Sequence, residues 1–222
     1  MILYKSNRDD SGFGTVDLAK KQLILERKIK YPAELLDPKK PLESWKDVLA
    51  ERGKRQAQAL RSLREDIFNE PSLGEFENID EVADDIRMII EELATNSFDF
   101  RMTKATGKNF GILDSAVRRV SEVSEMSYEE KRLLAGFLQR GRSSAAKDFT
   151  IEVQIYFDKD RLIICYSDGF DQNSAADKIA SAINPEVTEF RGRGFFLVQS
   201  LSDGHVVAID DPKKLILFKN LN

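Results

Sequence analysis

A β-hairpin is predicted by the stretch Thr150-Ile151-Glu152-Val153-Gln154-Ile155-Tyr156-Phe157-Asp158-Lys159-Asp160-Arg161-Leu162-Ile163-Ile164-Cys165-Tyr166. Apolar and polar side chains alternate up to Phe157, as in a strand with one buried face. The next three residues have turn chemistry, and the mostly apolar run from Arg161 returns as a second strand. Cys165, the only cysteine, lies in this run. We therefore expect a buried small side chain and not a reactive thiol.

Helix and strand patterns lie on both sides of this hairpin. Before it, we expect a half-buried strand from Lys21 to Tyr31 and long helices from Ser44 to about Asn69 and from an N-cap at Asp80 to about Phe100. After it, we expect a short helix near Ser174–Ile183, a helix over Gly194–Leu201, and strands at Val206–Ile209 and Leu215–Phe218. These patterns predict a chain of mixed helices and strands, of the α/β class.

Two segments have weaker patterns. Residues 1–20 show no steady period and contain Asp10-Ser11-Gly12-Phe13-Gly14, so we expect an irregular lead-in. Residues 101–148 form a long insertion, in which a capping-box signal at Ser127-Tyr128-Glu129-Glu130 predicts a helix to about Leu138. We expect residues 1–222 to form one domain that includes both segments.

Composition excludes several classes of protein. The chain has 222 residues, is 41% hydrophobic and 32% charged, and has no apolar run near the roughly 18 residues that span a bilayer. We expect no membrane association. A net charge of −4 does not favour nucleic-acid binding. The start lacks a secretory signal and the single cysteine cannot form an internal disulfide, so we expect a cytoplasmic protein.

Charge is distributed unevenly along the chain. Residues 71–100 contain nine acidic residues and one basic residue, Arg87, whereas residues 101–148 contain ten basic and six acidic residues. This pattern fits an acidic metal-binding helix followed by a basic, mobile excursion, and it equally fits two solvated faces.

Glu92 and Asn96 are four residues apart on the second long helix, so both lie on the face that Asp85 and Met88 continue. A carboxylate beside a phosphate-bound Mg²⁺ can accept a proton from a hydroxyl group or water. An amide oxygen is a hard, neutral ligand suited to Mg²⁺. The pair alone also fits an exposed polar helix face.

A second polar stretch, Ser167-Asp168-Gly169-Phe170-Asp171, follows the hairpin. Gly169 permits a turn at the strand end, where the Asp168 carboxylate could accept a hydrogen bond from the exocyclic amine of adenine. An ordinary Ser-Asp-Gly turn is the alternative interpretation.

A third stretch, Arg191-Gly192-Arg193-Gly194-Phe195, opens an apolar helix. Backbone N–H groups at a helix N-terminus can receive phosphate, glycine allows close approach, and the two arginines add positive charge. The stretch also fits a flexible helix entry, and it lacks the Gly-Lys-Ser or Gly-Lys-Thr of a Walker loop.

Together the three stretches resemble the GHKL, or histidine kinase-like, ATPase superfamily. Ile90–Ser97 looks like its N box, and Arg191–Asp203 is similar to the last glycine box of the anti-sigma-factor, serine-kinase branch. The resemblance covers roughly residues 20–100 and 149–220. It implies a Bergerat-type ATP-binding fold, a two-layer α+β sandwich with a mixed, mostly antiparallel sheet that carries helices on one face.

The resemblance also implies a site for ATP and Mg²⁺. In that site Glu92 is the general base, Asn96 is the magnesium ligand, and Gln172–Phe190 is the ATP lid. The implied nucleotide contacts are Ser167, Asp168, Gly169, Arg191, Gly192, Arg193, Gly194 and Phe195. A homodimer is expected from the family alone.

This chain departs from the family pattern at two places. The family's middle box is Asp-x-Gly, but Asp168 is followed directly by Gly169. Either Ser167 takes the place of the acid, or Asp168 does so with the glycine displaced. The second departure is the insertion at 101–148, which is long for the family and is expected to meet a partner or cover the pocket.

The function expected from these features is phosphorylation of another protein. His205, the only histidine, follows the glycine helix and enters a strand, so we expect it to be structural and not a phosphoacceptor. The resemblance then implies an ATP-dependent serine/threonine kinase acting on a regulatory partner, either a sigma factor or an anti-anti-sigma-like protein. The alternatives are a catalytically degenerate GHKL module that sequesters a partner, and a simple ATPase.

Overall fold

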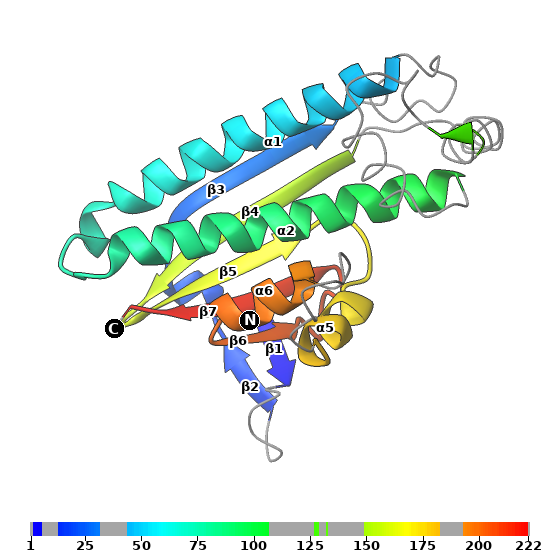
Figure 1. Cartoon of the computed structure of the whole chain (residues 1–222). Helices are drawn as coiled ribbons and strands as arrows, with labels where there is room; N and C mark the ends of the chain where they lie inside the picture. Colours follow the sequence, from blue (N-terminus) through cyan, green and yellow to red (C-terminus); the bar gives the residue numbers. More distant parts are fainter. Residues whose placement is uncertain are drawn as a thin grey trace. The chain divides into compact units, whose positions relative to one another are not determined.

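The computed structural model describes residues 2–5, 13–31, 44–106, 127–128, 132, 149–182 and 193–221. Within them lie four α-helices and an open five-stranded sheet, so the protein is of the α/β class. The strand order is β3-β4-β5-β7-β6, and the sheet is antiparallel (Figure 1). No parallel pair occurs in the described part of the chain, so the expectation of a mixed sheet is wrong there.

The central hairpin forms as its alternation predicts. Strand β4 is Phe149–Asp158 and strand β5 is Arg161–Ser167, with Ile155 opposite Ile164. At the turn Lys159 has a φ of 61°, in the left-handed region that tight turns use. Strand β7, Lys214–Asn220, pairs with β5 and places Leu217 opposite Ile164. Strand β6, Gly204–Val207, forms the edge next to β7.

Two long helices precede the hairpin. Strand β3 is Gln22–Tyr31 and helix α1 is Ser44–Phe68, as expected. After α1, the Glu70 side chain accepts a hydrogen bond from the Ser72 N–H and caps the short 3-10 helix Pro71–Leu73. Helix α2 is Ile79–Thr106, so it starts one residue earlier and ends six residues later than expected. Asp80 therefore lies in the first turn of α2 and is not its N-cap.

Contacts divide the chain into two compact units. One unit contains Met1–Ile29, Gln58–Ala94 and Thr150–Asn222. The other contains Lys30–Ala57 and Thr95–Phe149. The expectation of a single domain over residues 1–222 stays a prediction.

In the first unit, one face of the sheet carries helices. Buried apolar residues recur at helical spacing on α1 and α2, and Arg64 of α1 donates to Asp84 of α2 (2.8 Å) and to Asp80 (2.5 Å). Helix α5 is Asn173–Ala180 and α6 is Arg193–Leu201. The buried stripes are Leu60, Leu63 and Ile67 on α1 and Val82, Ile86, Ile89, Ile90 and Leu93 on α2.

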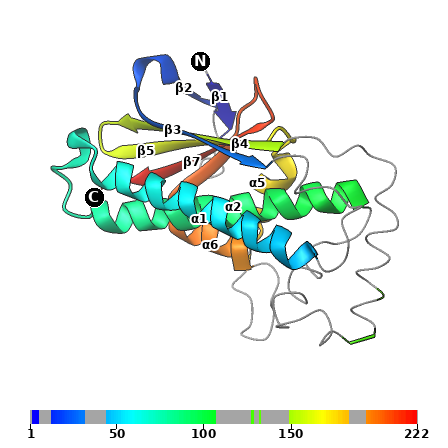
Figure 2. The same cartoon turned by 90° about the horizontal axis from the view of Figure 1, so that it is seen from above.

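The opposite face of the sheet carries a second hairpin. Strands β1, Ile2–Lys5, and β2, Phe13–Val16, pair with each other in antiparallel fashion. They lie on the side of the sheet away from α6 (Figure 2). The irregular lead-in expected at 1–20 is therefore wrong for these eight residues. A third, partial layer covers the sheet beyond the two layers expected.

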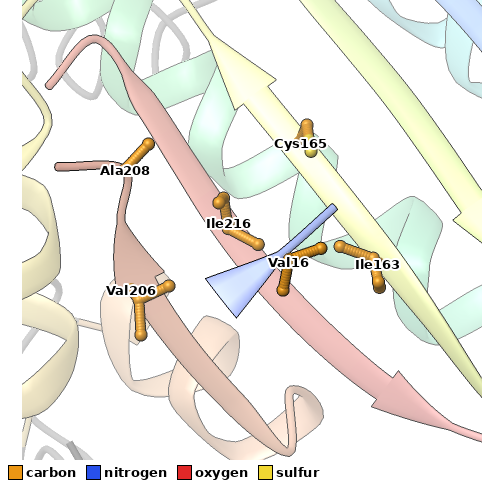
Figure 3. Packing of buried hydrophobic residues seen from close by; sticks show 6 residues of the cluster. All are labelled: Val16, Ile163, Cys165, Val206, Ala208 and Ile216. Atoms are coloured by element: carbon orange, nitrogen blue, oxygen red, sulfur yellow. The ribbon is translucent and has the colours of Figure 1, made fainter. Parts of the chain in front are cut away.

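Val16 joins this hairpin to the sheet. It is buried in a cluster with side chains of β5, β7 and β6 and the residue after β6 (Figure 3). Cys165 belongs to this cluster and burial raises the pKa of its thiol to about 12, so it is the buried, unreactive side chain that we expected. The cluster members are Val16, Ile163, Cys165, Val206, Ala208 and Ile216.

The second unit has its own aromatic core. Tyr31 is fully buried and stacks on Phe149 with 5.2 Å between ring centroids, while Phe98 tilts against it at 5.3 Å. The Tyr31 hydroxyl donates to Gln56 Oε1 (3.4 Å), and Gln56 Nε2 donates to Thr95 Oγ1 (3.0 Å). The buried polar groups of this core are thereby paired.

Candidate functional site

Glu92 lies on α2 and is half-buried. Burial raises the pKa of its carboxyl group, and the neighbouring charge of Glu91 raises it further. Glu91 itself pairs with Arg87 one turn earlier (3.0 Å). A carboxylate whose pKa is raised toward neutral pH is a better proton acceptor than an exposed one.

Asn96 lies one turn after Glu92 on the same helix. Its Nδ2 atom is buried and has no hydrogen-bond partner among the residues that the structure describes. An unpaired buried donor costs about 1–3 kcal/mol. Native proteins retain few such groups, and a bound ligand is one reason for keeping one.

The turn after β5 is built around Asp168. Its side chain is buried, and its Oδ1 accepts hydrogen bonds from the Phe170 N–H (2.9 Å) and from Gln172 Nε2 (2.5 Å). Gly169 has a φ of 81°, a conformation that a side chain would strain. The local sequence thus folds as an Asx-turn that fixes the Asp168 carboxylate.

The register of β5 separates Asp168 from Ser167. Ile163 and Cys165 contact Val16 on the face of the β1–β2 hairpin, and alternation puts Ser167 on that same face. The opposite face carries Leu162, whose β7 neighbour Lys219 bonds to helices α2 and α6. Ser167 is the last residue of β5, and Asp168 is the first residue of the turn that follows it.

The glycine stretch is only partly described. Helix α6 begins at Arg193, and Gly194 and Phe195 lie half-buried in its first turn. Lys178 of α5 lies over the Phe195 ring, with Nζ 5.6 Å from its centroid. Arg191 and Gly192 lie outside the described residues, as does most of the insertion with its expected helix from Ser127.

The first half of the expected lid is helix α5. Ala176 and Ile179 are buried, and the Ala176 carbonyl bonds to His205 Nε2 (3.1 Å). This half of the lid is therefore part of the packed core, and residues 183–190 lie outside the described ranges. His205 is buried and hydrogen-bonded, as expected of a structural histidine.

Sequence reasoning missed Gln172 and Lys219. Gln172 is buried, donates from its backbone N–H to the Pro212 carbonyl (2.8 Å), and holds Asp168 through its side chain. Lys219 bonds to Asp85 on α2. A lysine after the apolar run of β7 gives no signal of its partner, because the partner is 134 residues away.

Within the residues that the structure describes, no group of three or more His, Cys, Asp or Glu side chains that could hold a metal ion occurs. None of the helices in the described ranges has the length and apolar character to cross a membrane.

Comparisons with protein-family models, with curated proteins and with solved structures find no match for this chain. What the structure defines is therefore a class: an α/β protein with an open antiparallel sheet, helices on one face, and a half-buried acid on the second long helix.

Proposed function

We propose that this protein binds ATP and Mg²⁺ and transfers the γ-phosphate to a hydroxyl group of a regulatory partner, in the manner of the anti-sigma-factor serine kinases. The observation that supports it most is the half-buried Glu92 carboxyl group on α2, four residues before Asn96 in the same helix. The partner class, a sigma factor or an anti-anti-sigma-like protein, the Bergerat fold and a homodimer rest on the family resemblance alone.

Each residue then has a chemical role. Phosphoryl transfer needs positioning and charge neutralisation, and the metal supplies neutralisation of the phosphates when it is bound. Asn96 would hold Mg²⁺ through Oδ1, and its Nδ2, which has no partner in the described ranges, would donate to a phosphate oxygen. Glu92 accepts the proton of the partner's hydroxyl group, and the first turn of α6 at Gly194 receives phosphate.

The test is transfer of labelled phosphate from ATP in the presence of Mg²⁺ and candidate partners. Glu92→Gln should reduce transfer by about a hundredfold or more, because it removes the base without changing the side chain's size. Glu91→Gln is the matched control, since Glu91 is the adjacent residue and is paired with Arg87. Equal transfer by wild type and Glu92→Gln would remove Glu92 from its role.

A simple ATPase is distinguished in the same assay. There the label is released as inorganic phosphate whether or not a partner protein is added, and release still depends on Glu92, because the same base activates water.

A second function, nucleotide-independent capture of a partner, is favoured by the contacts of Asp168. Its Oδ1 is already held by Phe170 and Gln172. A carboxylate committed to its own turn recognises adenine less well, and a pocket without adenine recognition would leave only a binding module.

Thermal melting separates these two functions. ATP with Mg²⁺ at a hundred times its dissociation constant should stabilise the protein by about 2.7 kcal/mol. In a protein of this size each kcal/mol raises the Tm by about 2–4 °C. No shift at millimolar ATP would favour the partner-binding module.

A further inference from the structure

Lys219 on β7 connects the two helices on which the proposed function depends. Its Nζ donates to Asp85 Oδ2 on α2 (2.6 Å) and to the Leu201 carbonyl at the end of α6 (3.0 Å). The Asp85 and Lys219 side chains are 12% and 17% exposed, so the pair is largely removed from water. We call these three groups the Asp85–Lys219–Leu201 link; all belong to the same compact unit.

The link lies on the functional face of α2. Asp85 and Glu92 are seven residues apart, which is two helical turns, so both project from one side of the helix. A displacement of α2 at Asp85 therefore displaces Glu92 with it, because a hydrogen-bonded helix moves as a rigid segment.

The link also fixes the end of α6. Leu201 is the last residue of α6, where carbonyl groups lack partners within the helix and the dipole is negative. The Lys219 ammonium satisfies one of these carbonyls and carries the favourable charge. Helix α6 has only nine residues, so a fixed C-terminus also fixes the first turn at Gly194.

We infer that Lys219 is a positioning residue for the nucleotide site: through the Asp85–Lys219–Leu201 link it sets the placement of the α6 phosphate end against the base-bearing face of α2. This inference rests on the proposed function. The link holds α2 and α6 in the described part of the chain through one ammonium group, so its loss changes their spacing without removing any group that touches nucleotide.

The test compares Lys219→Met with Lys21→Met. Lys21 also forms a 2.6 Å pair with a largely buried aspartate, Asp158, at the end of the β4–β5 hairpin. In Lys21→Met, Asp158 keeps a second partner in Arg161 (3.3 Å). Lys219→Met removes the ammonium partner of Asp85, so the double variant Asp85→Asn with Lys219→Met is included, because it leaves no unpaired buried carboxylate at this position. Lys219→Arg, which keeps the charge, is the rescue variant.

Two readouts are measured on the full chain, amide hydrogen exchange without nucleotide and the Kd of ATP with Mg²⁺. Both Lys219→Met variants should speed exchange at residues 198–202 and raise the ATP Kd about tenfold, a typical coupling between sites. Lys219→Arg should recover most of the affinity, and Lys21→Met should leave both readouts within about twofold of wild type.

Three results would overturn the inference. Unchanged exchange in α6 would show that the link does not hold the helix. Faster exchange with an ATP Kd equal to that of Lys21→Met would leave Lys219 a merely structural residue. Absence of ATP binding by the wild type would overturn the proposed function and the inference together. The wild type is measured first, so this result is distinguished from a failure of the inference alone.

Discussion

The carboxyl group of Glu92 is half-buried, and its pKa is raised by burial and by the Glu91 charge. The folded protein therefore holds this proton more tightly than the unfolded chain does. The stability that Glu92 contributes is fully present below its ordinary pKa of 4.5 and is lost as pH rises through the raised pKa. An acid kept at a destabilising position is typical of a functional site.

Glu92→Gln should therefore raise the Tm at neutral pH, because it removes the need to ionise a half-buried group. The gain over wild type should shrink as pH falls and disappear below 4.5. Melting curves across this range check it, with Glu91→Gln as the control: it removes the smaller cause of the raised pKa and breaks the Arg87 pair, so its gain should be smaller. A gain that is the same at every pH would contradict the ionisation argument.

His205 should make stability depend on pH in the opposite direction. Burial lowers the pKa of its imidazole below 6.5, while the Ala176 carbonyl partly opposes this shift. Its contribution to stability is present above 6.5 and is lost as pH falls through the lowered pKa. The Tm of wild type should therefore fall more between about pH 7.5 and about pH 5.5 than that of His205→Gln, whose amide can still donate to Ala176. Parallel profiles would contradict this.

At the residue scale, the sequence patterns predicted which side chains are buried better than they predicted which side chains bond to each other. The apolar run around Cys165 predicted its burial, since neighbours in a strand decide it. The choice between Ser167 and Asp168 could not be made, because it depends on which face of the sheet carries helices. The hydrogen bond from Gln172 to Asp168 was not expected, because it depends on the turn that brings the two side chains together.

Among the elements, the hairpin β1–β2 was missed for a physical reason. Each strand has four residues, and β2 contains Gly14, a residue that is unfavourable in a strand. Such a hairpin is marginal alone and is stabilised by packing, here of Val16 on the sheet. Helix α2 was expected to end near Phe100, but the next residues favour helix and no glycine occurs before Gly107.

Val16→Ala should destabilise the fold by about 2 kcal/mol, because it removes two buried methyl groups and leaves a cavity beside β5 and β7. Urea unfolding measures the change in the free energy of unfolding. Leu23→Ala on β3 is the control, since Leu23 is 47% exposed and should change stability by less than about 0.5 kcal/mol. Equal effects of the two substitutions would show that the hairpin contributes little.

For the whole molecule, most strands of the sheet and the long helices were predicted because their periodic patterns extend over many residues, although the sheet is antiparallel and not mixed. The contacts between the elements that carry the candidate site residues were not predicted, because these contacts join segments that are far apart in the chain. Lys219 with Asp85 is the clearest case. The function proposed therefore depends on whether α2 and α6 serve one ligand.

Calorimetric titration of ATP in the presence and absence of Mg²⁺ tests the main proposal, that this protein binds ATP together with Mg²⁺. Wild type should show saturable one-site binding that requires Mg²⁺. Asn96→Ala should weaken it by about tenfold or more, since it removes the proposed metal ligand. Glu92→Gln should retain it, because the proposed base acts in transfer and not in binding. Absence of saturable binding at millimolar ATP, or binding that is indifferent to Mg²⁺ and to Asn96, would contradict the account.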